Sequence, residues 1–271
     1  MTSFKRELAP KIIDQLKEEP LFVDQLKADC EKGEVFPAVR KGEIHFYYKG
    51  GCLYRFGGKK FSRDKEYDKP EYSEGTEGRG DYEKAKKQNE NKFTSAKGEA
   101  TERQILDGLN RHTFGPGQKT KTVVLDIEVR LNGNTGRGKK CDMVLLNTST
   151  NQIMFVEGKL FSDERVKGSK PKVIEQVDTY TQAIAEQKQN IVDQYNNHIK
   201  IINDIFGTAY NPNISLIDTA KLFVFETPDP LNDNGRYSVE KITGTLGEKN
   251  VAWFVKGETP SIDEVWERLC Q

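Results

Sequence analysis

The sequence of 271 residues predicts an α/β (α+β) fold, with a mixed central sheet flanked by helices and a small α+β region at the N-terminus. Two observations support this prediction. From residue 97 to residue 226, segments with helical and strand periodicity follow one another in the order α-β-β-β-α-β. Hydrophobic residues make up 35% of the chain, enough for a buried core, while 31% of the residues are charged and suit a solvated surface.

Residues 1–61 predict two helices followed by a small antiparallel sheet. Apolar side chains recur at helical spacing in KIIDQLKEE and LFVDQLKADCEKG, and Gly33 is suited to end the second helix. The stretch VFPAVRKGEIHFYYKGGCLYRFGGKKF then has short runs rich in Val, Ile, Phe and Tyr, separated by breaks that contain glycine. These runs are typical of an antiparallel β meander.

Residues 62–92 lose nearly all apolar content, in SRDKEYDKPEYSEGTEGRGDYEKAKKQNENK. This composition predicts an exposed polar linker or loop, with room for one short helix around DYEKAKKQ. The linker is the predicted domain boundary, and residues 93–271 are expected to form the second domain.

The second domain is predicted to begin with a helix from about residue 97 to residue 112, ahead of Gly115 and Pro116. The segment KTVVLDIEVRL is predicted to be a strand, because every second residue from Val123 to Leu131 is apolar. Two strands, a long helix, two strands and a terminal helix follow, in CDMVLL, QIMFVEGKL, the stretch from Pro171 to about residue 206, TAKLFVFE, VAWFVKG and SIDEVWERL.

The charge balance limits the ligands that the whole chain can attract. Lys and Arg number 42 and Asp and Glu number 42, so the formal net charge is +0, and a nucleic-acid ligand requires a local basic patch.

The N-terminus has no apolar signal-peptide core, and no run of about 18 apolar residues is present. We therefore expect a cytoplasmic protein without a membrane partner. The 4 cysteines and 3 histidines lack the spacing of a zinc site.

The hairpin CDMVLLNTSTNQIMFVEGKL places charged residues at the ends of two otherwise apolar strands. Glu157 and Lys159 are two residues apart, so they project from the same face of their strand. If the two strands pair antiparallel, Asp142 at the start of the first strand lies beside them. Two carboxylates on one face suit a hard divalent cation. The competing interpretation is a surface ion pair, which contributes about 0–1 kcal/mol.

These residues resemble the signature of the PD-(D/E)xK nuclease superfamily, in which an Asp on the second core strand is followed by (Asp/Glu)-x-Lys on the third. Here the signature reads Asp142, then Glu157-Gly158-Lys159. The α-β-β-β-α-β order is similar to the restriction-endonuclease-like core of that family. The resemblance covers about residues 95–226, and Cys141 stands where the family name has proline.

The resemblance extends to both core helices. Many members add a glutamate from the first core helix, which Glu99 would supply, with Glu102 as the competing candidate. Many also carry a Gln and a Tyr on the helix after the third strand, and Gln176 and Tyr180 match them in spacing.

The resemblance implies metal-dependent hydrolysis of phosphodiester bonds in nucleic acid, by a DNA endonuclease of the restriction, repair or defence kind. Asp142, Glu157, the carbonyl of Gly158 and Glu99 would bind Mg²⁺ or Mn²⁺. Lys159 would position or activate water, and a homodimer is compatible because many such nucleases cut both strands as dimers. The alternative is a catalytically inactive protein of the same fold that binds nucleic acid or a protein.

Basic clusters flank the proposed site in the sequence. RGKK precedes Asp142, RVKGSKPK follows the third strand, and each phosphate that such residues neutralise contributes through counterion release. Solvated loops are the alternative interpretation of these clusters. Gln176 is expected to support the site or touch the phosphate backbone. The residues predicted to bind substrate are Arg137, Lys139, Lys140, Lys170, Lys172 and Tyr180.

Overall fold

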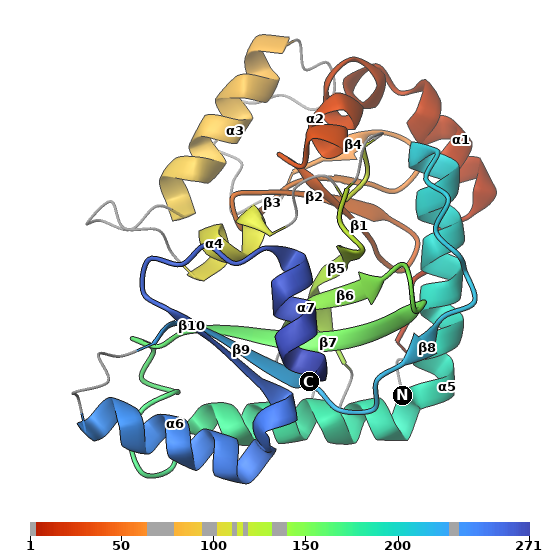
Figure 1. Cartoon of the computed structure of the whole chain (residues 1–271). Coiled ribbons are helices and arrows are strands. Elements are labelled where there is room, and N and C mark those ends of the chain that lie inside the picture. The colour runs from red at the N-terminus through yellow and green to blue at the C-terminus, as the bar shows by residue number, and fades with distance from the viewer. Residues whose placement is uncertain are drawn as a thin grey trace. The chain divides into compact units, whose positions relative to one another are not determined.

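The computed structural model describes residues 4–63, 79–93, 102–109, 113–115, 119–131, 140–227 and 233–271 (Figure 1). The chain divides into two compact units, each assembled from segments that are distant in sequence. Unit 1 comprises Met1–Phe4, Thr120–Asp193 and Asn213–Gln271, and unit 2 comprises Lys5–Lys119 and Gln194–Pro212. Residues 93–119 therefore belong with the N-terminal region and not with the second domain that the sequence predicted.

Unit 2 contains a four-stranded antiparallel sheet in the order β1-β2-β3-β4, as the meander prediction required. Aromatic side chains form much of its core. The ring of Phe22 lies 6.1 Å from that of Phe46 and 6.0 Å from that of Phe206. The elements of unit 2 are α1(Pro10–Glu18), the π-helical turn η1(Phe22–Leu26), α2(Lys27–Lys32), β1(Phe36–Val39), β2(Ile44–Tyr48), β3(Gly51–Phe56), β4(Phe61–Ser62), α3(Arg79–Phe93) and α4(Glu102–Gly108).

Helix α3 begins within the stretch 62–92, which the sequence predicted as a polar linker, and ends one residue beyond it. One face of the helix is buried through Tyr82 and Lys86, which are 2% and 8% exposed. The Tyr82 hydroxyl donates a 2.7 Å hydrogen bond to Asp29, and the Lys86 ammonium contacts the same carboxylate at 2.9 Å. The helix is thus held by polar and aromatic groups. It confirms the short helix that the sequence allowed around DYEKAKKQ, although it is longer than that segment.

Unit 1 contains a mixed six-stranded sheet, which confirms the mixed sheet with helices that the sequence predicted. The strand order is β10-β9-β7-β6-β5, with β8 also paired to β7. β6 is antiparallel to both of its neighbours, β5 and β7, whereas β7, β9 and β10 run parallel. The strands are β5(Thr122–Arg130), β6(Lys140–Asn147), β7(Gln152–Leu160), β8(Ser215–Leu216), β9(Lys221–Thr227) and β10(Val251–Val255).

The helices of unit 1 cover this sheet. The long helix α5(Lys172–Phe206) departs from helical geometry at Gln187 and passes into unit 2 at Gln194. α7(Ile262–Cys270) crosses in front of the strands in Figure 1 and contacts β5, β9 and β10. The remaining elements are α6(Asp233–Leu246) and the short 3₁₀ turn η2(Glu248–Asn250).

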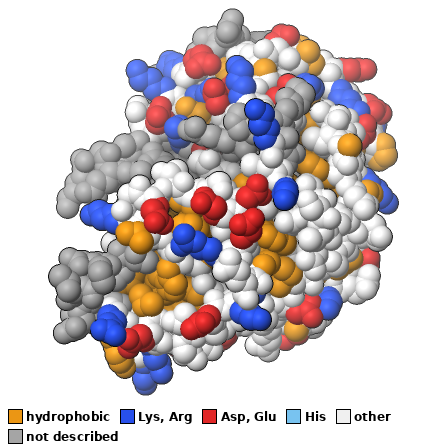
Figure 2. All heavy atoms as spheres, viewed as in Figure 1, with side chains coloured by type: hydrophobic (Ala, Val, Ile, Leu, Met, Phe, Trp, Pro, Cys, Tyr) orange, Lys and Arg blue, Asp and Glu red, His pale blue; other side chains and the backbone are white. Residues whose placement is uncertain are grey.

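The surface of the described residues is mixed in charge. Acidic and basic side chains intermingle on the face in Figure 2, in keeping with the formal net charge of +0. Hydrophobic side chains gather where β9, β10 and α6 lie in that view, and Tyr237 and Val255 of these elements are 51% and 58% exposed. Within the described ranges, none of the helices has the length and apolar character needed to cross a membrane.

Candidate active site

The β6–β7 hairpin brings the start of one strand beside the end of the other. Met143 pairs with Val156 in antiparallel register, so Asp142 lies next to Glu157 just beyond the last pair. β7 is a central strand, paired with β6 on one side and β9 on the other, and it is buried from Ile153 to Lys159. Glu157 therefore lies near the carboxyl end of central strand β7, and Asp142 lies beside it at the start of β6. This is the edge where open α/β sheets build ligand sites.

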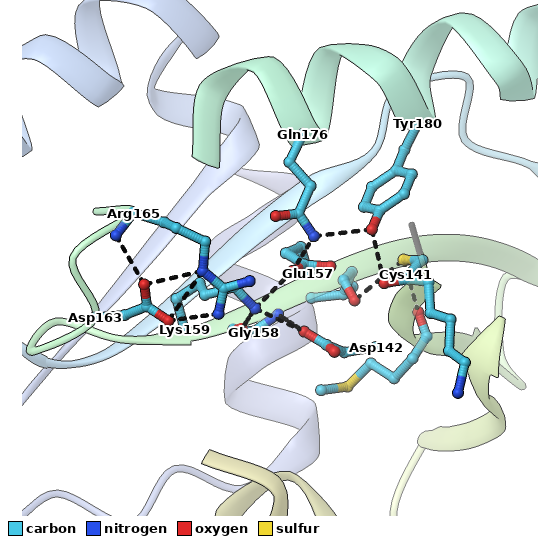
Figure 3. Close-up of polar contacts among 12 residues, drawn as sticks. Cys141, Asp142, Glu157, Gly158, Lys159, Asp163, Arg165, Gln176 and Tyr180 are labelled. Carbon is cyan, nitrogen blue, oxygen red and sulfur yellow. Dashed lines mark hydrogen bonds and ion pairs between the residues drawn. The ribbon is translucent and has the colours of Figure 1, made fainter. Parts of the chain in front are cut away.

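The ammonium of Lys159 lies among three oxygen atoms (Figure 3). Its Nζ is 2.6 Å from Glu157 Oε1, 2.5 Å from the carbonyl oxygen of Gly158 and 3.2 Å from Asp142 Oδ2. The side chain of Lys159 is 2% exposed and that of Glu157 is 1% exposed. Buried charges are costly unless they are paired and hydrogen-bonded, and here the three donors of the ammonium meet three acceptors.

Asp142 is tied to the next strand by a second contact. Its Oδ2 accepts a 2.8 Å hydrogen bond from the backbone N–H of Gly158. Gly158 thus donates to one member of the site and offers its carbonyl oxygen to another, Lys159. The side chain of Asp142 is 18% exposed, so solvent reaches the site beside this carboxylate.

Helix α5 holds Glu157 through a chain of hydrogen bonds. Gln176 Nε2 donates to Glu157 Oε1 at 2.5 Å and to the hydroxyl of Tyr180 at 2.9 Å. That hydroxyl donates in turn to the backbone carbonyl of Lys140 at 2.6 Å. Burial, and then the negative charge of Glu157, raise the pKa of Tyr180, so the phenol stays protonated and keeps its donor.

Tyr180 was predicted to bind substrate, and the structure places it behind the carboxylates. The residue is 2% exposed and Gln176 is 6% exposed, and both point from one face of α5 toward the hairpin in Figure 3. A residue in this position acts on the site by orienting its neighbours.

Cys141 precedes Asp142, and its side chain is buried. Its Sγ donates to the carbonyl of Val156 at 3.3 Å. Burial, and then the charges of Glu157 and Asp142, raise the pKa of this thiol well above its ordinary value. Because the thiolate is the form that attacks electrophiles and binds metals, Cys141 is an inert structural cysteine.

The turn after β7 carries an ion pair near the site. Arg165 Nε lies 2.9 Å from one oxygen of Asp163, and its terminal nitrogen lies 2.5 Å from the other. The hydrogen bond from Arg165 is the main cause that lowers the pKa of Asp163, against the opposing effect of burial. Lys159 also lowers this pKa, which places the pair within electrostatic range of the site.

The structure separates the predicted basic residues into two groups. Lys170 and Lys172 are exposed where the turn after β7 meets α5. Lys140 opens β6, two residues before Asp142, and its side chain is 41% exposed and lies 2.7 Å from Glu128 Oε2. Arg137 and Lys139 lie outside the described residues.

The contribution of a helix glutamate to the site stays a prediction. Glu99, the first candidate, lies outside the described residues. Glu102, the second candidate, is the first residue of α4 and belongs to unit 2, whereas the hairpin belongs to unit 1.

Sequence reasoning missed two carboxylates on strand β5. The strand register puts Glu128 beside Asp142 and Asp126 opposite Val144, on the same face of the sheet. Asp126 is 0% exposed, and Glu128 has a φ of 51°, in the left-handed region that few residues other than glycine adopt. The available signal was the pair of acidic residues in VLDIEVR, which interrupts an apolar strand.

The donor atoms of the site fit a hard divalent cation. Carboxylate and carbonyl oxygens are the ligands that Mg²⁺ and Mn²⁺ prefer, and the ammonium of Lys159 is a stand-in cation on which these oxygens converge. Within the part of the chain that the structure describes, no group of three or more His, Cys, Asp or Glu side chains is arranged to hold a metal. Water and substrate phosphate would have to complete the coordination.

Comparison of the chain with family models, with curated proteins and with solved structures finds no match. The functional argument therefore depends on the residues and the geometry described above.

Proposed function

We propose that this chain is a metal-dependent nuclease that hydrolyses phosphodiester bonds of nucleic acid, with DNA as the expected substrate. The observation that supports the proposal is the convergence of Asp142, Glu157 and the Gly158 carbonyl on one cation, the ammonium of Lys159. The same residues carry the resemblance to the PD-(D/E)xK superfamily. Motif and geometry thus point to the same site.

The residues of the site would have different roles in the proposed reaction. Asp142, Glu157 and the Gly158 carbonyl would hold Mg²⁺ or Mn²⁺, which acts as a Lewis acid on the scissile phosphate and lowers the pKa of water. Lys159 would orient water or stabilise the negative charge that develops on the phosphate. Gln176 would keep Glu157 in position from α5.

Exposed basic residues next to the hairpin would bind the nucleic-acid backbone. The exposed residues Lys170 and Lys172 would offer cations to phosphates, and Lys140 would extend the set on β6. Such contacts would supply the local basic patch that a chain with a net charge of +0 requires. Binding should consequently weaken steeply as the salt concentration rises.

A catalytically inactive binding module is the second candidate. The observation that favours it is that Lys159 already neutralises part of the charge of the two carboxylates. The buried charges are therefore paired without a metal. On this alternative, Asp142, Glu157 and Lys159 stabilise the hairpin, and the chain binds nucleic acid or a protein without cleaving it.

Nicking of a supercoiled plasmid separates the two candidates. We expect the wild-type protein to nick the plasmid in Mg²⁺ or Mn²⁺ and to stop when a chelator is added. Asp142→Asn and Glu157→Gln remove charge with little change in shape, and each should slow nicking by about 10²–10³-fold or more, the loss typical of a main electrostatic contribution. The matched control is Glu164→Gln, because this side chain is 88% exposed and pairs with Lys167, three residues further along the same turn.

Two results would contradict the proposed nuclease activity of this site. Wild-type protein that binds DNA or RNA but leaves single and double strands intact at every metal concentration would establish the binding module. Nicking that survives in both Asp142→Asn and Glu157→Gln would show that the activity resides elsewhere.

A further inference from the structure

We infer that Lys159 is the resident cation of the site, and that a divalent metal ion binds there only by displacing its ammonium. The inference rests on the proposed function, because it concerns the metal of the proposed nuclease. It adds a property that the motif does not specify: the lysine and the metal compete for the same three oxygens.

The geometry supports this competition. The ammonium lies 2.5–3.2 Å from the oxygens of Gly158, Glu157 and Asp142. A Mg²⁺ ion bound to the same oxygens, at about 2.0–2.1 Å from each, would occupy the space between them that the ammonium fills. The two cations would also repel strongly at such short range in a buried site. The ammonium and the metal therefore exclude one another.

Displacement of the Lys159 ammonium costs free energy and requires new acceptors for the charge. The residue is 1% exposed, so a departing ammonium gives up three acceptors in a site with little water. Its flexible four-carbon stem allows the charge to move while the backbone stays in β7. Solvent meets the site beside Asp142, and a phosphate arriving there would offer new acceptors to the displaced ammonium. Metal should consequently bind weakly to the free protein.

The test measures binding of Mn²⁺ alone, without substrate, by titration calorimetry. Lys159→Met removes the charge from an unbranched side chain of similar length, and Lys159→Gln removes the charge but keeps a donor. We expect both variants to bind Mn²⁺ about tenfold or more tightly than wild type, the effect of sparing one charge-assisted hydrogen bond. Lys188→Met is the matched control, because this side chain is 54% exposed and pairs with Asp218 on the same unit, and it should bind like wild type.

Circular dichroism melts keep the inference testable if the variants fold poorly. Removal of Lys159 leaves Asp142 and Glu157 without their ammonium, so Lys159→Met should melt lower than wild type in chelator. Saturating Mn²⁺ should raise its Tm by more than it raises the Tm of wild type, since metal restores the missing charge. A variant that unfolds in chelator but folds when Mn²⁺ is added supports the inference in the same way.

The outcomes separate this inference from the proposed function. Equal or weaker Mn²⁺ binding by Lys159→Met and Lys159→Gln, with an equal or smaller rise in Tm, would overturn the competition and leave the metal site standing. Absence of Mn²⁺ binding in wild type and in all variants would overturn the metal site itself, and the inference with it. The double variant Asp142→Asn, Lys159→Met should lose the tight binding, which assigns the signal to these oxygens.

Discussion

Gln176 donates a 2.5 Å hydrogen bond to Oε1 of Glu157, the same oxygen that lies 2.6 Å from the ammonium of Lys159. One carboxylate oxygen thus receives an amide donor from helix α5 and an ammonium from its own strand. The amide fixes the carboxylate from a second element, so the orientation of Glu157 does not depend on the hairpin alone. Supporting groups of this kind set the affinity and reactivity of the ligands that they hold.

Replacement of Gln176 by leucine should therefore impair the site without removing any of its charged groups. We expect Gln176→Leu to reduce Mn²⁺ affinity and Mg²⁺-dependent nicking by about 10–100-fold, the usual effect of losing a partner of a metal ligand. Titration with Mn²⁺ and plasmid nicking measure the two effects.

Gln182→Leu is the matched control for this variant. Gln182 lies on the same helix, is exposed, and donates to Glu186 at 3.1 Å, away from the carboxylates of the hairpin. It should retain the metal affinity and the nicking rate of wild type. Equal losses in the two variants would show that the helix tolerates leucine poorly and that the amide of Gln176 has no particular role.

Tyr180→Phe removes the hydroxyl that links Gln176 to the carbonyl of Lys140. We expect the free energy of unfolding to fall by about 1–3 kcal/mol, because the variant leaves buried polar groups without this partner. Urea unfolding measures the change. Tyr237→Phe is the control, since Tyr237 is 51% exposed, and its effect should stay within about 0.5 kcal/mol.

The hairpin was the most predictable part of the site. Alternation of side chains in a strand and the antiparallel return of the chain were enough to place Asp142 near Glu157 and Lys159. The sequence could not show that the ammonium lies among the oxygens, because that position depends on the rotamer of a four-carbon side chain. It also could not show that Tyr180 is buried behind Gln176, because the depth of a helical residue depends on how the helix packs.

Strand β5 shows why alternation alone is insufficient. The sequence predicted that Val123 and Ile127 share one face, but the pairing shifts between Val124 and Asp126, where a β-bulge inserts one residue. The insertion reverses the faces of the residues that follow. It thereby turns Asp126 to the face of Asp142, which no periodicity argument anticipated.

The division of the chain into units was the least predictable feature. A polar composition suggested a linker at residues 62–92, yet Tyr82 and Lys86 bury one face of α3 through partners such as Asp29, some fifty residues earlier in the chain. Helix α5 runs from unit 1 into unit 2, so one boundary between the units falls inside a continuous helical segment, where composition gives no signal of it. Composition reports local solvation and carries no information on such distant partners.

The cysteines offer a test of how firmly the hairpin is closed. Cys30 and Cys141 are 0% exposed, whereas Cys270 is exposed and Cys52 is partly exposed. Brief alkylation at pH 8 followed by mass spectrometry should modify Cys270 first, and Cys141 only after denaturation, because burial raises the pKa of the Cys141 thiol. Cys30 is the internal control. Modification of Cys141 well before Cys30 would mean that the start of β6 opens and that Asp142 is not held beside Glu157.

His45 on β2 predicts that unit 2 loses stability in mild acid. Its side chain is 12% exposed and lies 3.0 Å from a carboxylate oxygen of Glu43. Burial lowers the pKa of His45 from 6.5 to about 4, and the hydrogen bond to Glu43 offsets this only in part. The folded protein therefore keeps the imidazole neutral down to about pH 4, whereas the unfolded chain protonates below about pH 6.5.

The sign of the effect follows from this difference in proton binding. The contribution of His45 to the free energy of unfolding is fully present above pH 6.5. It falls as the pH drops toward 4, because the unfolded chain takes up the extra proton, and below pH 4 it does not change further. The full shift in the pKa of His45 corresponds to a loss of about 3 kcal/mol in the free energy of unfolding. Urea unfolding of wild type and His45→Gln at pH 7.5 and pH 4.5 measures it. Effects of pH that do not involve His45 are common to both proteins, so wild type should lose about 2–3 kcal/mol more than the variant. Equal losses would show that the imidazole is solvated.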